Sequence, residues 1–85
     1  MKTFSHVIGD PLGLHARTAG LLVRESAHYK SDVWVKLGER LADGRNLIDL
    51  MSLHAEYGHC IQVEISGEDE ESACQGIKKL LQENL

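Results

Sequence analysis

The chain has 85 residues, 42% of them hydrophobic and 26% charged, and its formal net charge is −4. This composition is typical of one folded domain, and the acidic balance excludes the basic surface that nucleic-acid binding requires. No apolar run approaches the ~18 residues of a membrane-spanning helix, and the start turns polar too soon for a signal peptide. We therefore expect a single monomeric domain over residues 1–85, with no nucleic-acid partner and no membrane insertion.

The first part of the chain predicts a strand, a turn and a helix. Residues 3–8 are rich in β-forming residues, and residues 16–28 have apolar side chains at helical spacing. Between them, the order Asp10-Pro11-Leu12-Gly13 is typical of a type I turn. Gly20 weakens the helix by about 1 kcal/mol relative to alanine unless another group approaches closely there. The side chains predicted to face the core are those of Ala19, Leu22, Val23, Ser26 and Ala27.

The centre of the chain predicts a β-hairpin and a short helix. Residues 32–37 alternate as a strand, and Gly38-Glu39 suits a tight turn into a return strand over residues 40–42. Asn46 is a good N-cap for an apolar helix over residues 47–53. This helix is apolar on more than one side, which indicates either an exposed contact surface or a helix sunk in the core.

The last part predicts a strand with one wet face over residues 60–66 and a helix that Asp69 can cap and that runs to near Leu85. The core side of this helix consists of Ala73, Ile77, Leu80 and Leu81. The element order is therefore β-α-β-β-α-β-α. It predicts a two-layer α+β fold, in which three helices cover one face of a four-stranded antiparallel sheet and the other face meets solvent.

Several histidines and both cysteines have unremarkable contexts. Cys60 and Cys74 form no CxxC motif and are expected to be buried thiols in a reducing, cytoplasmic compartment. His54 and His59 have no third ligand at metal-binding spacing, so we expect a surface loop there, with no metal and no cofactor. His6 falls on the inward face of the first strand, either as a satisfied core histidine or at a sheet edge, and is assigned no function.

His15 stands where phosphoryl chemistry is favoured. It follows a glycine turn and precedes a helix, whose first N–H groups lack partners and attract anions. Arg17 adds a guanidinium that matches phosphate oxygens. A nucleophilic imidazole beside an anion receptor suits a transient phosphohistidine, although an ordinary residue at a helix start shows the same spacing.

The motif Gly13-Leu14-His15-Ala16-Arg17 closely resembles the active centre of the HPr family, the phosphocarrier proteins of the bacterial sugar phosphotransferase system. Residues 45–53 resemble the second-helix segment of that family. Residues 67–70, followed by Ala73, resemble its last strand-to-helix junction. The three segments have the family's spacing, and the family's open-faced β-sandwich has the element order predicted above.

This resemblance implies a stoichiometric histidine phosphocarrier rather than an enzyme. HPr accepts a phosphoryl group from phosphorylated enzyme I and passes it to the IIA domain of a sugar-specific enzyme II. The acceptor would be Nδ1 of His15, and Arg17 would steady the phosphate. Partners would dock on a rim formed by Ala16, Gly20, Arg24, Leu47, Ile48 and Met51.

Some positions depart from the family's pattern. Thr18 replaces the usual proline, which is expected to loosen the helix start and alter the phosphohistidine lifetime. Asn46 replaces a regulatory serine, so phosphorylation by an ATP-dependent kinase is expected to be absent there. His54 replaces a helix-ending glycine, and a left-handed conformation costs it about 1 kcal/mol.

The charge of the docking rim also departs from the pattern. Asp49 stands where a small or basic residue is common, and Ala27 contributes no charge. Only Arg17, Arg24 and Arg45 are then left to steer acidic partners.

Three alternatives follow from the residues. One is a carrier of the same family that has diverged to a regulatory or nitrogen-type relay. Another is a binding module without phosphoryl transfer that holds a partner on residues 47–51, which the departures at Thr18, Asp49 and His54 favour. A metal-dependent hydrolase built on His54 and His59 lacks the carboxylates that it would need.

Overall fold

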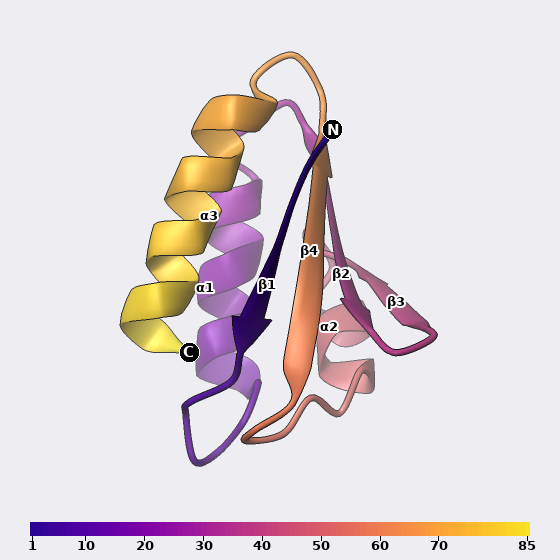
Figure 1. Ribbon diagram of the computed structural model, residues 1–85, viewed down its shortest axis with the longest axis vertical. Coiled ribbons are helices and arrows are strands. Elements are labelled where there is room, and N and C mark those ends of the chain that lie inside the picture. The colour runs from indigo at the N-terminus through magenta and orange to yellow at the C-terminus, as the bar shows by residue number, and fades with distance from the viewer.

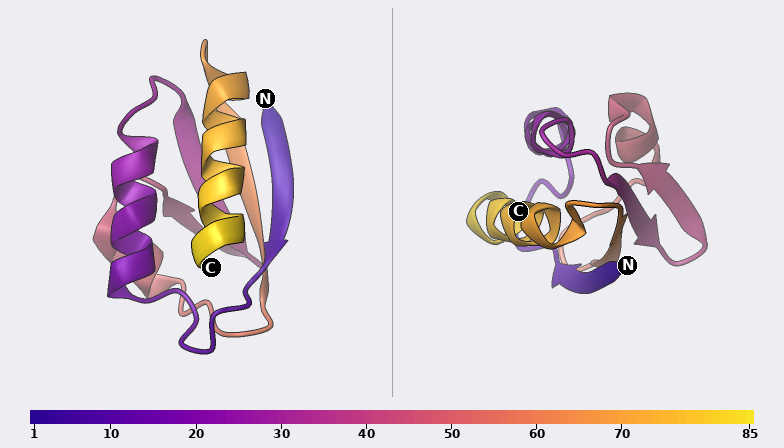
Figure 2. Two further views of the ribbon diagram at one scale, coloured as in Figure 1. Left: turned by 90° about the vertical axis from the view of Figure 1, so that its left-hand side faces the viewer. Right: turned by 90° about the horizontal axis from the view of Figure 1, so that it is seen from above.

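The computed structural model describes residues 1–85, which form one sheet with three helices on a single face (Figures 1 and 2). The strands are β1 (Lys2–Val7), β2 (Asp32–Leu37), β3 (Arg40–Asp43) and β4 (Cys60–Ser66), and the helices are α1 (Ala16–Ser26), α2 (Leu47–Ser52) and α3 (Glu70–Asn84). The chain order and the fold class predicted from the sequence are confirmed, with ends that differ by one or two residues. None of the three helices combines the length and the hydrophobicity that a membrane span requires.

The sheet is antiparallel throughout and has the strand order β1-β4-β2-β3. β4 lies between β1 and β2, so the first and last strands of the chain pair side by side. Leu37 pairs with Arg40 across the β2–β3 hairpin, which leaves Gly38-Glu39 as the predicted two-residue turn. Gly38 has φ +60, a conformation that glycine adopts without a steric cost.

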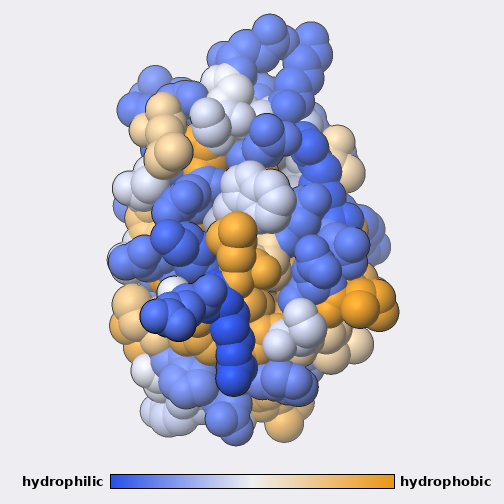
Figure 3. Space-filling model, turned by 90° about the vertical axis from the view of Figure 1, so that its right-hand side faces the viewer, coloured by the Kyte–Doolittle hydropathy of each residue, from blue (hydrophilic) through white to orange (hydrophobic).

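The inward faces of the strands and helices share one core, because side chains alternate along a strand and recur every three to four residues along a helix. Leu22 of α1 and Ile77 of α3 are fully buried against the sheet, and α2 contributes Leu50. The buried sheet residues are Val33, Val35, Ala42, Ile61, Val63 and Ile65. Figure 3, which views the molecule from the side of β2 and β3, shows a mainly hydrophilic surface interrupted by apolar side chains.

Helix α1 ends earlier than the sequence predicts, and Ala27 is therefore not a core residue. The last turn tightens, because the His28 N–H bonds to the Glu25 carbonyl at 3.0 Å, three residues back. This leaves Ala27 exposed as the C-cap residue of α1, whereas Ser26 stays buried.

Asp69 occupies the N-cap position of α3 as predicted, but its side chain does not cap the helix. The carboxylate instead accepts bonds from the N–H groups of Lys30 and Ser31, both at 2.9 Å, and from the Ser31 hydroxyl. These bonds hold the pKa of the Asp69 carboxyl below its ordinary value of 3.8, and the bond from the Ser31 hydroxyl has the largest effect. Asp69 thus ties the start of α3 to the connection between α1 and β2, while the Glu70 side chain accepts from the Gly67 N–H.

The prediction of two buried thiols is wrong, and one of the two alternatives for His6 is confirmed. Cys60 is exposed and Cys74 is half-buried, and both are free thiols. Because Ile61 faces the core, its neighbour Cys60 must point to the other side of the sheet. His6 lies half-buried on the inward face of β1, which is an edge strand, so the sheet-edge alternative is confirmed. Its Nε2 atom is enclosed without a hydrogen-bond partner, so it is not a satisfied core histidine.

Candidate functional site

The loop between β1 and α1 forms the turn predicted at Asp10-Pro11-Leu12-Gly13. The Gly13 N–H bonds to the Asp10 carbonyl at 2.9 Å, which closes the turn. The Leu12 N–H bonds to Oδ1 of Asp10 at 2.9 Å, so the aspartate side chain closes a second ring inside the first. This pattern, which favours Asp at the first position of a turn, holds the carboxylate in one place.

Gly13 brings this loop against the connection between α2 and β4. Its φ is +71, and a Cβ atom at this position would lie 2.6 Å from the Ala55 carbonyl oxygen. The next N–H, that of Leu14, bonds to the same oxygen at 2.8 Å. Only glycine permits this approach, which fixes the start of α1 beside the end of α2.

His15 is the N-cap residue of α1 and has an extended backbone, with φ −119 and ψ 179. Its carbonyl accepts the first intrahelical bond, from the Ala19 N–H at 2.8 Å. The Thr18 hydroxyl accepts from the His15 N–H and donates to the His15 carbonyl, each at 3.1 Å. The main chain of His15 is therefore held at both its N–H and its carbonyl group by the Thr18 hydroxyl.

The His15 ring makes its side-chain hydrogen bond through Nε2, which lies 3.1 Å from Oδ2 of Asp10. The two side chains are 27% and 17% exposed, so the pair is partly shielded while the imidazole stays accessible. The pKa of the Asp10 carboxyl is lowered below its ordinary value of 3.8. The hydrogen bond from the Leu12 N–H has the largest effect, and the His15 ring and the charge of Arg17 add to it. Asp10 is therefore an anion at neutral pH.

Arg17 lies in the first turn of α1, exposed and without an ion pair or hydrogen bond to the protein. The first N–H groups of a helix have no intrahelical acceptor, so this end of α1 carries partial positive charge. A half-exposed imidazole, a helix start and an unpaired guanidinium thus occur together, as the sequence predicts, and together they suit a phosphoryl group.

The apolar side of α2 is divided between core and surface. Leu50 is fully buried, whereas Leu47, Ile48 and Met51 are 40%, 75% and 36% exposed. The interpretation of α2 as a helix sunk in the core is therefore wrong, and these three side chains form an apolar surface. Helix α2 packs against α1, on which Ala16 and Arg24 are exposed and Gly20 is half-buried.

Gly20 and Asn46 have different structural roles at this surface. No atom lies within 4 Å of a Cβ placed on Gly20, so nothing inside the molecule requires glycine there. Asn46 caps α2 as predicted, because its Oδ1 accepts from the Asp49 N–H at 3.0 Å. His54, just after α2, adopts the left-handed conformation expected of it, with φ +53.

The guanidinium of Arg45 is bound within the protein, so the prediction that it is free to steer acidic partners is wrong. Its Nη2 donates to the carbonyls of Tyr29 and Ser31 at 2.7 and 2.6 Å, and its Nη1 lies 3.6 Å from the Asp32 carboxylate. Arg45 therefore clamps the β3–α2 connection to the loop before β2. Arg17 and Arg24 are left as the exposed cations of α1.

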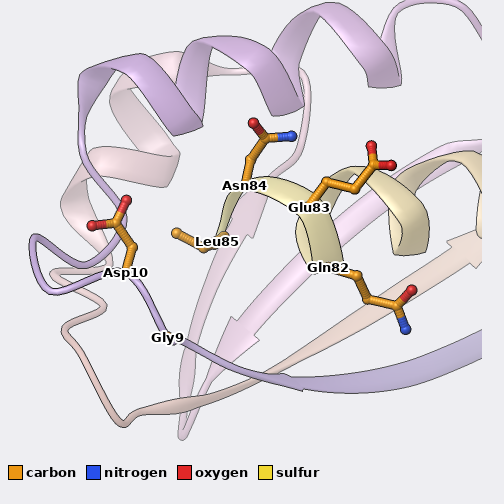
Figure 4. A pocket seen from close by; sticks show the side chains of 6 residues that line it. All are labelled: Gly9, Asp10, Gln82, Glu83, Asn84 and Leu85. Carbon is orange, nitrogen blue, oxygen red and sulfur yellow. The ribbon is translucent and has the colours of Figure 1, made fainter.

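Other titratable side chains do not extend the site. His54 and His59 are exposed, and Nδ1 of His59 accepts from the Glu56 N–H at 2.9 Å. No group of three His, Cys, Asp or Glu side chains is placed to hold a metal ion. An open depression of about 340 Å³ lies beside Asp10, between the end of β1 and the last turn of α3 (Figure 4). Its lining includes both Leu85 and Glu83, and the carboxylate of Glu83 does not favour an anion.

Comparison with known proteins decides the family. A family model described as the HPr component phosphorylation site of the phosphotransferase system matches residues 2–83. The chain belongs to the HPr family. HPr from Mycoplasma genitalium is 36% identical over 85 residues, which cover 99% of this chain and 97% of that protein.

Solved HPr structures have the same fold. HPr from Thermoanaerobacter tengcongensis has a TM-score of 0.91 at 29% identity, covering 96% of this chain and 92% of that one. A mycoplasma histidine-containing phosphocarrier protein has a TM-score of 0.93 at 28% identity, with coverages of 96% and 93%. The sequence and the structure thus agree on an HPr-type phosphocarrier of the phosphotransferase system.

Sequence reasoning missed Asp10 as a neighbour of the HPr histidine. The sequence predicts the type I turn, but this pattern assigns the side chain of Asp10 only to forming the turn. A short acceptor five residues before His15, held by a turn that reverses the chain, is the signal that was present.

Thr18→Val removes the hydroxyl that binds both main-chain groups of His15 but keeps the shape of the side chain. We expect the free energy of unfolding to fall by about 1–3 kcal/mol, because the His15 N–H is left without its acceptor. Denaturant unfolding measures this, with the exposed residue Thr3 changed to Val as the matched control. Equal stability of the two variants would contradict the anchoring role of Thr18.

Proposed function

We propose that this HPr-type chain accepts a phosphoryl group on Nδ1 of His15 from phosphorylated enzyme I and passes it to IIA domains. The observation that carries the proposal is the placement of His15 at the N-cap of α1, two residues before an unpartnered arginine. Family membership supports the choice of donor and acceptor.

The chemistry is an in-line exchange of one phosphorus–ligand bond for another. The lone pair of Nδ1 attacks phosphorus, a bond from phosphorus to Nδ1 forms, and the bond from phosphorus to the donor breaks with its electron pair leaving on the donor. Such transfers depend on positioning and on cations around the equatorial oxygens. Arg17 and the first N–H groups of α1 supply positive charge at this place.

We propose that the chain acts as a monomeric, cytoplasmic carrier formed by a single domain over residues 1–85, without a cofactor and without turnover of its own. The loop that holds His15 lies at the surface, and no enclosed cavity surrounds the imidazole. A partner must therefore exclude water and complete the site, which is the work of a carrier rather than of an enzyme.

The partner-binding surface proposed is the rim around His15. On α2, the exposed side chains of Leu47, Ile48 and Met51 give it an apolar centre. Apolar side chains that are exposed together are typical of docking sites. The open space over Gly20 supports close approach of a partner backbone to α1. The α1 members of the rim are Ala16, Gly20 and Arg24.

A diverged module that binds a partner on the same surface without phosphoryl transfer is the second candidate. The exposed α2 surface serves it equally well, but the intact main-chain support of His15 by Thr18 favours transfer. Asn46 has no hydroxyl, so we propose that serine-type regulation at the start of α2 is absent in either case.

His15→Ala should abolish phosphorylation by enzyme I and phosphoenolpyruvate while the fold remains, because this half-exposed ring packs into no core. Intact mass and acid lability of the adduct measure the modification, and His28→Ala, an exposed histidine beyond the end of α1, is the control. A phosphorylated His15→Ala variant would disprove the acceptor. An unmodified wild-type chain would instead favour the binding module.

Ala27→Lys should accelerate phosphorylation a few-fold at low salt, because it extends the row of cations formed by Arg17 and Arg24 on α1. Ala27 is exposed and follows the last residue of α1, so no packing is lost. The gain should shrink at physiological ionic strength, where the Debye length is about 8 Å. Gln75→Lys, on the exposed side of α3, is the control. An equal gain from both variants would mean that net charge, and not the α1 surface, governs association.

A further inference from the structure

We propose that Asp10 is a positioning residue for His15 and sets the protonation of its ring before and after phosphoryl transfer. The inference rests on the proposed function and adds a group to it. Asp10 would act through the imidazole and would not touch the phosphoryl group itself.

The main chain of Asp10 is held by two hydrogen bonds of its own and by a third from its neighbour Gly9. Its N–H and that of Gly9 both donate to the Leu85 carbonyl, at 3.1 and 2.6 Å, which ties the loop to the end of α3 (Figure 4). Its carbonyl accepts from the Gly13 N–H at 2.9 Å. The place of the carboxylate is therefore set by the fold, independently of the histidine.

The two oxygens of the Asp10 carboxylate have different hydrogen-bond partners. Oδ1 accepts from the Leu12 N–H at 2.9 Å, and Oδ2 lies 3.1 Å from Nε2 of His15. The bond to Leu12 fixes which oxygen faces the ring. The carboxyl remains ionised because its pKa is lowered, so it presents only an acceptor to the histidine.

An acceptor at Nε2 selects one tautomer of the neutral ring. Nε2 must carry the hydrogen, and Nδ1 then keeps its lone pair. A carboxylate that holds a catalytic or metal-binding imidazole in one tautomer and one orientation is a recurrent arrangement in proteins. In this chain it leaves Nδ1 as the nucleophilic nitrogen.

The same contact balances the charge after transfer. When Nδ1 bonds to phosphorus and the donor bond breaks, the Nε2 hydrogen stays in place, and the ring carries a positive charge that the Asp10 carboxylate offsets. When the next acceptor attacks phosphorus, the bond to Nδ1 breaks and its electron pair returns to the ring. No proton has to leave or arrive in either direction, so the carrier stays ready to transfer both ways.

A merely structural aspartate and a positioning aspartate predict opposite orders for two variants. Asp10→Asn can keep the bond from Leu12 to Oδ1, but its NH2 group then faces Nε2 and draws the ring hydrogen to Nδ1. Asp10→Ala loses the turn bond but leaves the ring free to keep either tautomer. A structural role makes alanine the worse variant, whereas a positioning role makes asparagine the worse one.

The experiment measures His15 ring ¹⁵N shifts at about pH 8, where an ordinary histidine is neutral, and the rate of phosphorylation by enzyme I. We expect the wild-type ring to show a protonated Nε2 and a bare Nδ1, and Asp10→Asn to shift hydrogen toward Nδ1. The rate should fall roughly tenfold for Asp10→Asn and a few-fold for Asp10→Ala, the size expected from losing one charged hydrogen bond.

Asp43→Asn is the matched control, since Oδ1 of Asp43 accepts from the Arg45 N–H at 2.9 Å in the same type of turn, with no histidine beside it. An unchanged His15 tautomer in Asp10→Asn, or a slower rate for Asp10→Ala than for Asp10→Asn, would overturn the proposal. A wild-type chain that enzyme I does not phosphorylate would instead overturn the proposed function, while the ring shifts would still decide the tautomer.

Discussion

The approach of Gly13 to the Ala55 carbonyl is the contact on which the rest of the site depends. A side chain at Gly13 would collide with this oxygen. Because glycine has none, the β1–α1 loop can lie directly against the α2–β4 connection. That contact places the start of α1, which carries His15 and Arg17, near the end of α2, a helix with exposed apolar side chains. The proposed phosphoryl acceptor and the proposed partner surface are thus brought together by one backbone contact.

Around this contact, several polar side chains form hydrogen bonds within the protein and are not free to attract partners. The Thr18 hydroxyl holds the main chain of His15, and Asp10 meets its ring. Arg45, which carries one of the few positive charges near α2, is committed to backbone carbonyls. With a net charge of −4, the molecule holds the proposed acceptor His15 in place but has few cations on the proposed docking surface, so apolar contacts should dominate its binding energy.

The sequence predicted those features that depend on local patterns. Alternation in β2 and β4, helical spacing in α1 and α3 and the cap at Asn46 all follow from neighbours in the chain, and so does the turn before His15. The features that it did not predict depend on distant partners. Asp69 binds Ser31 and not its own helix, and Arg45 reaches the carbonyl of Tyr29. Asp10 contacts His15 only because the turn reverses the chain, and the spacing of apolar residues in the sequence does not predict such a contact.

The position of phosphorus on the His15 ring decides most directly whether Nδ1 is the phosphoryl acceptor. The wild-type chain, labelled with ¹⁵N in its histidines and phosphorylated by enzyme I, would be studied by NMR for ¹⁵N–³¹P coupling. We expect coupling to Nδ1 of His15, with Nε2 still carrying its hydrogen against Asp10. Coupling to Nε2, or to any other histidine, would contradict this expectation.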